Sequence, residues 1–153
     1  TAMLVKITNG NVDTYPYSAG QLRRDNPNTS FPKRIPDEML ESYGLYTVVY
    51  TDMPSIDDRT QKVEQEATPS LVSGAWTIGW STSDKTTEEI AEYDADAAAN
   101  VRAERDGLLA RSDWTQVADA PVDATAWATY RQALRDITDQ AGFPNDINWP
   151  TQP

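Results

Sequence analysis

The spacing of apolar and polar residues divides the chain into a strand-rich first part and a helical second part. Runs of β-branched and aromatic residues at 3–8 and 45–51 are typical of short strands. From about residue 84 the apolar residues recur every three or four positions, which is the period of an amphipathic helix. We therefore predict an α+β fold with two domains, residues 1–83 and 84–153.

Two short helices are expected among the first strands. Ser18 and Gln21 have the spacing of a capping box, so the first helix runs from there to about Asp25. Pro36 and Gly44 bracket the second helix, with proline at its first position and glycine just past its end. The N-terminal domain is therefore predicted as a small antiparallel sheet with short helices.

A β-hairpin is predicted after these elements. One strand is expected over residues 61–67 and the other from Trp76 to Ser81, with ATPSLVSG between them as the turn region. Alternation with period two places Trp76 and Trp80 on the same face. We expect both tryptophans in the core; the alternative is an exposed face that binds a ligand such as a sugar.

A long helix is predicted from about Thr87 to Ala110. Thr86 and Glu89 have the spacing of a capping box at its start. Its apolar stripe is narrow for its length, which is typical of a helix that packs on a small element or pairs with copies of itself. Self-association through this helix, as a dimer or trimer, remains an alternative to packing within the chain.

A second helix is predicted over residues 124–140, so that the C-terminal domain is a helical hairpin. Asp123 is placed to cap this helix and Gly142 follows its end. The apolar residues of one face are spaced three, four and three apart: Trp127, Tyr130, Leu134 and Ile137.

The segment GFPNDINWPTQP, from Gly142 to Pro153, carries Phe143, Ile147, Trp149 and three prolines. Large aromatic side chains bury the most area per residue, and proline reduces the entropy lost on ordering. We expect this aromatic and proline-rich tail to close the helical hairpin as a lid. The alternative is a hook that docks into a neighbouring protein.

Composition narrows the classes of function. The 153 residues include no Cys and no His, which excludes disulfides, cysteine metal sites, nucleophilic catalysis by Cys or His, and the commonest general base. No glycine-rich phosphate loop or calcium loop is present. Asp113 and Asp146 each lie close to a tryptophan in the sequence, and two such carboxyl groups could form the acid pair of a glycosidase. Such pairs also arise by chance in any acidic chain. We therefore expect no enzymatic activity, no cofactor and no metal.

The net charge is −11, and the acidic excess is concentrated in the second part of the chain. Residues 1–82 carry seven basic and ten acidic side chains, and residues 83–153 carry six and fourteen. An acidic chain is repelled by nucleic acid and by anionic membranes. No apolar run approaches the length of a membrane-spanning helix, and the N-terminus is too polar for a signal peptide. We expect neither nucleic acid nor a membrane as partner.

Three separated aromatic blocks near the C-terminus resemble a known family. The first is Arg-x-x-Leu-Leu-x-x-Ser-Asp-Trp, from Arg105 to Trp114. The second is Trp-x-x-Tyr-Arg-x-x-Leu-Arg-Asp, from Trp127 to Asp136, and the third is the Gly-Phe-Pro…Trp-Pro…Pro finish. The last third of the chain thereby resembles a tail module of bacteriophages and prophages, the phage tail assembly chaperone family, which is also found at the ends of tail-fibre proteins.

The first 90 residues are similar to a weaker pattern in phage tail proteins. The pattern consists of DNPNTSFP, the block PDEMLESYGLYTV and a tryptophan-containing hairpin followed by Thr-Thr-Glu-Glu. Neither resemblance brings catalytic residues with it.

The resemblance implies a non-enzymatic structural protein of the virion tail, assembled in the bacterial host cytoplasm and placed at the baseplate or at the tail fibre. Its partners would be other tail proteins and copies of itself, with a trimer favoured because tails are symmetric. The alternative is a transient assembly chaperone that the mature virion does not retain.

The candidate interface residues belong to the resembling module. Arg131 and Arg135 are four residues apart and are expected on one face, where each pairs with a nearby Asp or with a partner's carboxylates. Interface hot spots favour Trp, Tyr and Arg. The full candidate set is Trp114, Trp127, Tyr130, Arg131, Leu134, Arg135, Phe143 and Trp149.

Overall fold

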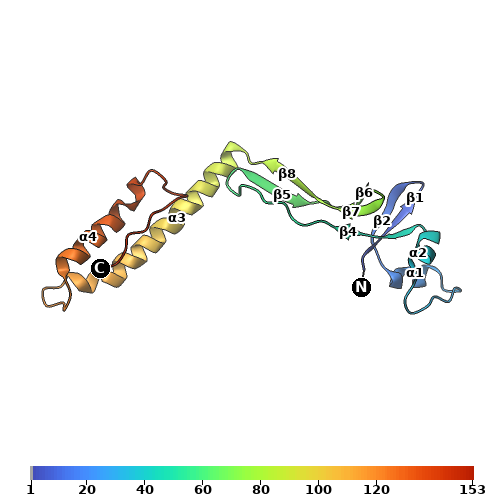
Figure 1. Cartoon of the computed structure of the whole chain (residues 1–153), viewed down its shortest axis with the longest axis horizontal. Coiled ribbons are helices and arrows are strands. Elements are labelled where there is room, and N and C mark those ends of the chain that lie inside the picture. The colour runs from blue at the N-terminus through green and yellow to red at the C-terminus, as the bar shows by residue number, and fades with distance from the viewer. Residues whose placement is uncertain (1) are drawn as a thin grey trace. The chain divides into compact units, whose positions relative to one another are not determined.

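The computed structural model describes residues 2–153 and has two compact units, Thr1–Asp84 and Lys85–Pro153 (Figure 1). The first unit contains eight short strands and two short helices, and the second is helical. The predicted α+β class is confirmed. Independent folding of the domains 1–83 and 84–153 stays a prediction.

The first sheet of unit 1 has the strand order β2-β1-β3 and is antiparallel. Its strands are β1 (Leu4–Thr8), β2 (Asn11–Tyr17) and β3 (Leu45–Thr47). Asn9 and Gly10 both have positive φ, as a tight two-residue hairpin turn requires. Strand β2 was not predicted, because it is polar and contains Pro16; proline is tolerated on an edge strand such as this one.

The two short helices of unit 1 are α1 (Ala19–Asp25) and α2 (Asp37–Ser42). The hydroxyl of Ser18 accepts from the backbone N–H of Gln21 at 3.1 Å, which confirms the predicted start of α1. Pro36 is the N-cap of α2, one position earlier than predicted. Both helices pack on the first sheet through a core cluster of Leu4, Tyr17, Leu22, Leu40 and Leu45.

Gly44 ends α2 with φ +71°, as predicted for a residue just past a helix end. The backbone approaches closely here, because the N–H of Ile7 donates to the carbonyl of Gly44 at 2.8 Å. A Cβ at residue 44 would lie 2.7 Å from the carbonyl oxygen of Ile7. Glycine is therefore required at this position both by the backbone angle and by space.

The predicted hairpin exists, but its pairing differs from the prediction. Residues expected to form only a turn contain β6 (Ser70–Val72), which pairs with β7 (Ala75–Ile78) across Ser73 and Gly74. Strand β5 (Gln61–Gln65) pairs instead with β8 (Trp80–Asp84). The positive φ of both turn residues, 49° and 81°, allows a tight turn that the sequence pattern did not locate.

The predicted strand over residues 45–51 is divided into β3 and β4 (Val49–Tyr50). Strand β4 pairs with β7 in parallel, so one pair in unit 1 departs from the predicted antiparallel pattern. Val48 between them is buried and belongs to a second core cluster with Val5 and Ile78.

Unit 2 is a helical hairpin made of α3 (Thr87–Ser112) and α4 (Ala124–Arg135), as predicted. The capping box of Thr86 and Glu89 is present, and Asp123 accepts from two backbone N–H groups at the start of α4. Each helix is followed by a 3-10 turn, η1 (Asp113–Gln116) and η2 (Asp136–Asp139). The α-helical part of the second helix therefore ends five residues before the predicted residue 140.

The core of unit 2 is small. Leu134, Ile137 and Thr115 are fully buried, whereas α3 contributes only Ala98 and Ser112 as buried residues. The narrow stripe predicted for α3 is thus matched by a narrow buried face. Self-association through this helix stays a prediction.

Candidate protein-binding surface

An aromatic cluster lies where the helical hairpin of unit 2 bends. The rings of Trp114 and Trp127 are 6.4 Å apart, and Trp127 meets Tyr130 edge to face at 5.6 Å. The exposed fraction rises from 5% at Tyr130 to 50% at Trp114. The cluster therefore reaches from the core of the unit to its surface.

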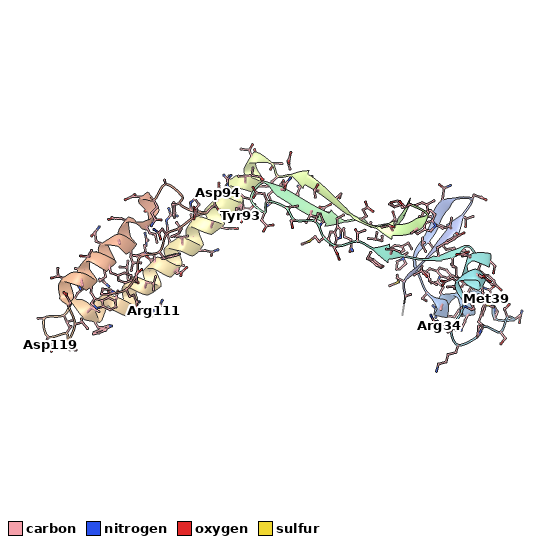
Figure 2. The ribbon with its side chains drawn as sticks, viewed as in Figure 1. Arg34, Met39, Tyr93, Asp94, Arg111 and Asp119 are labelled. Atoms are coloured by element: carbon pink, nitrogen blue, oxygen red, sulfur yellow. The ribbon has the colours of Figure 1, made fainter. Side chains whose placement is uncertain are left out.

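The outer part of this cluster forms an apolar surface, which we call the bend patch: Trp114, Val117 and Trp127. Trp114 belongs to η1, Val117 follows η1 and is 53% exposed, and Trp127 lies on α4 and is partly buried. Figure 2 shows Asp119 in the same connection, where it is exposed. Exposed large apolar side chains beside polar ones are characteristic of protein-binding sites.

Arg131 fixes the bend from the inside. It is 8% exposed, and its Nη1 donates to the carbonyl oxygen of Leu109 at 2.6 Å and to Oγ of Ser112 at 2.7 Å. Its Nη2 donates to Oδ1 of Asp113 at 2.7 Å. A cation at the end of α3 also offsets the negative end of the helix dipole. The guanidinium thus joins α4 to the last turn of α3.

Two further side chains stabilise the connection. Thr115 is fully buried and its hydroxyl donates to the carbonyl of Ser112 at 2.6 Å. The side-chain amide of Gln116 donates to the carbonyl of Ala124 at 3.1 Å, across the connection. The bend patch is therefore carried by a connection that is held by hydrogen bonds on both sides.

The two arginines of α4 do not share one environment. Arg131 is buried, whereas Arg135 is exposed and its nearest polar contact is a long one, 3.5 Å from Nη1 to Oε1 of Gln132. Arg131 forms the local pair with an Asp that was expected, with Asp113, and contact of either arginine with a partner's carboxylates stays a prediction. Ser112, the last residue of α3, and Asp113, which follows it, were the sequence signal for the role of Arg131, because a hydroxyl and a carboxylate together can bind a guanidinium.

The remaining candidate residues of α4 and of the tail divide between core and surface. Leu134 is fully buried, so it supports the patch and does not line it. Phe143 lies under the guanidinium of Arg102 on α3, with 5.3 Å between its ring centroid and Cζ. Trp149 is partly buried.

The tail is attached to the rest of unit 2 by polar contacts as well. The side-chain amide of Asn145 donates to Oδ1 of Asp94 on α3 at 2.7 Å. Gln140 and Asn148 exchange two hydrogen bonds, at 2.8 and 2.9 Å. The tail runs back beside α3 (Figure 1), which is the arrangement expected of a lid.

The two hairpin tryptophans of unit 1 lie on different strands. Trp76 on β7 packs against the second core cluster and its ring is 6.4 Å from that of Tyr46. Trp80 on β8 is partly buried and its Nε1 donates to the carbonyl of Thr51 at 2.9 Å. Gly79 separates the two strands, which pair with different partners, β7 with β6 and β8 with β5. Trp76 is thus partly buried, and a binding role for either tryptophan stays a prediction.

Among residues 2–153, no group of three or more acidic, His or Cys side chains is arranged so that it could hold a metal ion. No helix in the described part of the chain is both long and apolar enough to cross a membrane.

The exposed aromatic residues and the hydrogen-bonded bend define unit 2 as a helical-hairpin module of the kind that can present a contact surface. Residues 98–153 match the family model described as phage tail assembly chaperone protein. The match begins within α3 and extends through Pro153, so the resemblance predicted for the last third of the chain is confirmed. It supports a role in bacteriophage tail assembly. The chain has no significant match among curated proteins or among solved structures.

Proposed function

We propose that this chain is a non-enzymatic structural protein of a bacteriophage tail, placed at the baseplate or at the tail fibre, which acts through contacts with other tail proteins. The observation that carries the proposal is the bend patch, which lies within the segment that matches the tail assembly family. Trp114 leaves half of its surface exposed to water, and burying it against a partner is favourable.

The bend patch has the composition of an interface hot spot. Two tryptophans and an aliphatic side chain supply the apolar part, and the exposed Asp119 lies in the same connection. Such an arrangement suits a partner segment that brings an apolar residue to the centre and a basic residue to the edge.

The bend that carries the patch is ordered before any partner binds. Arg131, Thr115 and Gln116 hold the connection through hydrogen bonds to both helices. A surface that is already in its bound shape loses less conformational entropy on association, so more of the contact free energy contributes to affinity.

The proposed assembly is symmetric. Because tails are symmetric, a homo-oligomer with a trimer favoured fits such a position. The narrow buried face of α3 supports this, because most of that long helix stays available for contacts.

The second candidate is a transient assembly chaperone, and the description of the matching family favours it. A chaperone would bind a tail protein through the same bend patch and leave before the particle is complete. Both functions require an accessible apolar surface. They differ in how long the chain stays bound to its partner, not in the kind of contact.

Quantitative mass spectrometry of purified mature particles distinguishes the two. A fixed copy number that is a multiple of three supports the structural role. Absence from particles together with abundance in the lysate of infected cells contradicts it and supports the chaperone.

A further inference from the structure

Unit 1 contains a pocket of about 290 Å³ that the proposed function does not use. Leu4, Ile35 and Leu40 supply apolar lining, and Lys33 and Arg34 supply two positive charges. The lining also includes the carboxylate of Asp37. The pocket thus combines an apolar wall with a net positive charge, in a chain whose overall charge is −11.

The two cations are presented by an ordered loop between α1 and α2. Arg23 on α1 donates through Nη2 to the carbonyls of Pro32 and Lys33, at 2.9 and 3.2 Å. The side chains of Lys33 and Arg34 are exposed, and no hydrogen bond or ion pair within residues 2–153 engages them. Two adjacent cations held beside an apolar wall are suited to an acidic segment that carries an apolar side chain.

We propose that this pocket receives the first turns of α3 from a second copy of the chain. Glu88, Glu92 and Asp96 are exposed and are spaced four residues apart, so they lie on one side of the helix. Like charges at this spacing repel one another. The helix dipole favours acids only within the first turn, so it does not account for Glu92 or Asp96. Lys85 lines the same surface hollow as Glu92 and Asp96 and offsets part of this charge, and cations of a partner copy would offset the rest.

Tyr93 provides the apolar side chain of the same segment. It is 37% exposed and lies directly after Glu92. Its ring already accepts a cation, because Nζ of Lys85 lies 4.7 Å from the ring centroid. In the proposed contact, Tyr93 packs against the apolar wall of the pocket while Glu92 and Asp96 pair with Lys33 and Arg34. Figure 2 labels Arg34 and Tyr93, which come from different units.

This contact joins two different surfaces, the pocket of one copy and the helix of the next. A contact of this kind repeats from copy to copy and closes into a ring when the rotation between copies allows it. The inference rests on the homo-oligomer of the proposed function and names the contact that forms it.

The test uses the full chain and measures its molar mass by size-exclusion chromatography with light scattering at low salt. We expect the wild-type protein to exceed the monomer mass and to dissociate as salt screens the charges. Arg34→Glu should give a monomer. Arg111→Glu is the matched control, because it changes the net charge equally at an exposed position of unit 2 and should leave the oligomer intact.

A charge exchange then tests the pairing. Glu92→Arg alone should also give a monomer, and the double variant Arg34→Glu with Glu92→Arg should restore the oligomer. Circular dichroism confirms that each variant is folded. A wild-type monomer at low salt overturns both the contact and the proposed oligomer. An oligomer that persists in Arg34→Glu, or a double variant that stays monomeric, overturns the contact alone. The particle measurement of the proposed function is independent of each of these outcomes.

Discussion

Arg131 and Leu109 are joined by a hydrogen bond of 2.6 Å from Nη1 to the carbonyl oxygen, which connects α4 to the last turn of α3. The same guanidinium binds Ser112 and Asp113, so one buried side chain satisfies three acceptors of the bend. Removing the guanidinium leaves the carbonyl of Leu109 and the hydroxyl of Ser112 with fewer hydrogen-bond partners. The lost free energy destabilises the connection that carries the bend patch.

Arg131→Ala should therefore lower the free energy of unfolding of unit 2 by about 2–3 kcal/mol, which is typical of hydrogen bonds to a charged group in a buried site. Urea denaturation followed by circular dichroism at a helical wavelength measures the change, since most of the helix belongs to unit 2. Arg135→Ala is the control and should change stability by less than about 0.5 kcal/mol, because its side chain is exposed. Equal effects of the two substitutions would contradict the structural role of Arg131.

Trp114→Ala should separate binding from stability. Half of the Trp114 surface is exposed, so we expect a loss of about 1 kcal/mol in folding stability, well below that of a buried tryptophan. Incorporation into particles, or binding to the tail partner, should fall strongly, because an interface tryptophan commonly contributes 2 kcal/mol or more, roughly 30-fold in affinity.

The measurement for Trp114→Ala is a comparison of thermal unfolding with the copy number per particle. Trp80→Ala is a suitable second variant, because this tryptophan lies on β8 in unit 1 and outside the matching segment. Normal incorporation of Trp114→Ala would remove the bend patch from the proposed function.

Trp149→Ala tests whether the tail acts as a lid. The side chain is partly buried, and its segment is anchored through Asn145 to Asp94 and through Gln140 to Asn148. We expect a loss of roughly 2 kcal/mol in the stability of unit 2, somewhat less than the 3–5 kcal/mol of a fully buried tryptophan. Chemical denaturation measures it. Unchanged unfolding combined with lost assembly would identify the tail as a docking hook.

Local signals in the sequence located the starts of α3 and α4 and the end of α2 well. Thr86 with Glu89, Asp123 and Gly44 each act through neighbours within four residues, and all of them form the expected caps. The pairing of the hairpin was not predictable in the same way. It depends on which strands pair, β5 with β8 and β6 with β7, and alternation along one strand does not select its partner strand.

The sequence predicted the candidate site only in part, because it shows local signals but not the packing of distant segments. The resemblance selected Trp114 and Trp127, but their exposed fractions depend on how two distant segments pack. The burial of Arg131 follows from acceptors 18 to 22 residues away in the chain. A helical period places a residue on a face, but it does not decide which partner covers that face.

Glycine at position 44 provides a test of backbone strain. Gly44→Ala should lower stability by about 2 kcal/mol or more, because the residue has positive φ and the added Cβ would meet the carbonyl of Ile7 at 2.7 Å. Gly74→Ala is the matched control, with φ +81° and open space around the added atom. It should cost only about 1 kcal/mol, the penalty of the backbone angle alone. Thermal unfolding of unit 1 measures both, and equal losses would contradict the steric account.

Two tyrosines make the stability of unit 1 sensitive to alkaline pH. Burial raises the pKa of Tyr17 to about 12, and the hydrogen bond from its hydroxyl to Asp25, 2.6 Å long, adds to this. Burial also raises the pKa of Tyr15 to about 12, together with its hydrogen bond to the hydroxyl of Tyr50. Both values lie above the ordinary tyrosine pKa of about 10, so the folded state favours the neutral phenol.

The sign of the pH dependence follows from linkage. Because the unfolded chain releases these protons more readily, the stabilisation is fully present below pH 10 and is lost as the pH rises towards 12. Denaturant unfolding across that range should show a steady fall in stability. Tyr17→Phe removes an ionisable phenol, so the free energy of unfolding of unit 1 should fall less steeply with pH. Tyr93→Phe in unit 2 should leave this decline unchanged. An equally steep decline in Tyr17→Phe would show that this phenol does not contribute to the alkaline loss.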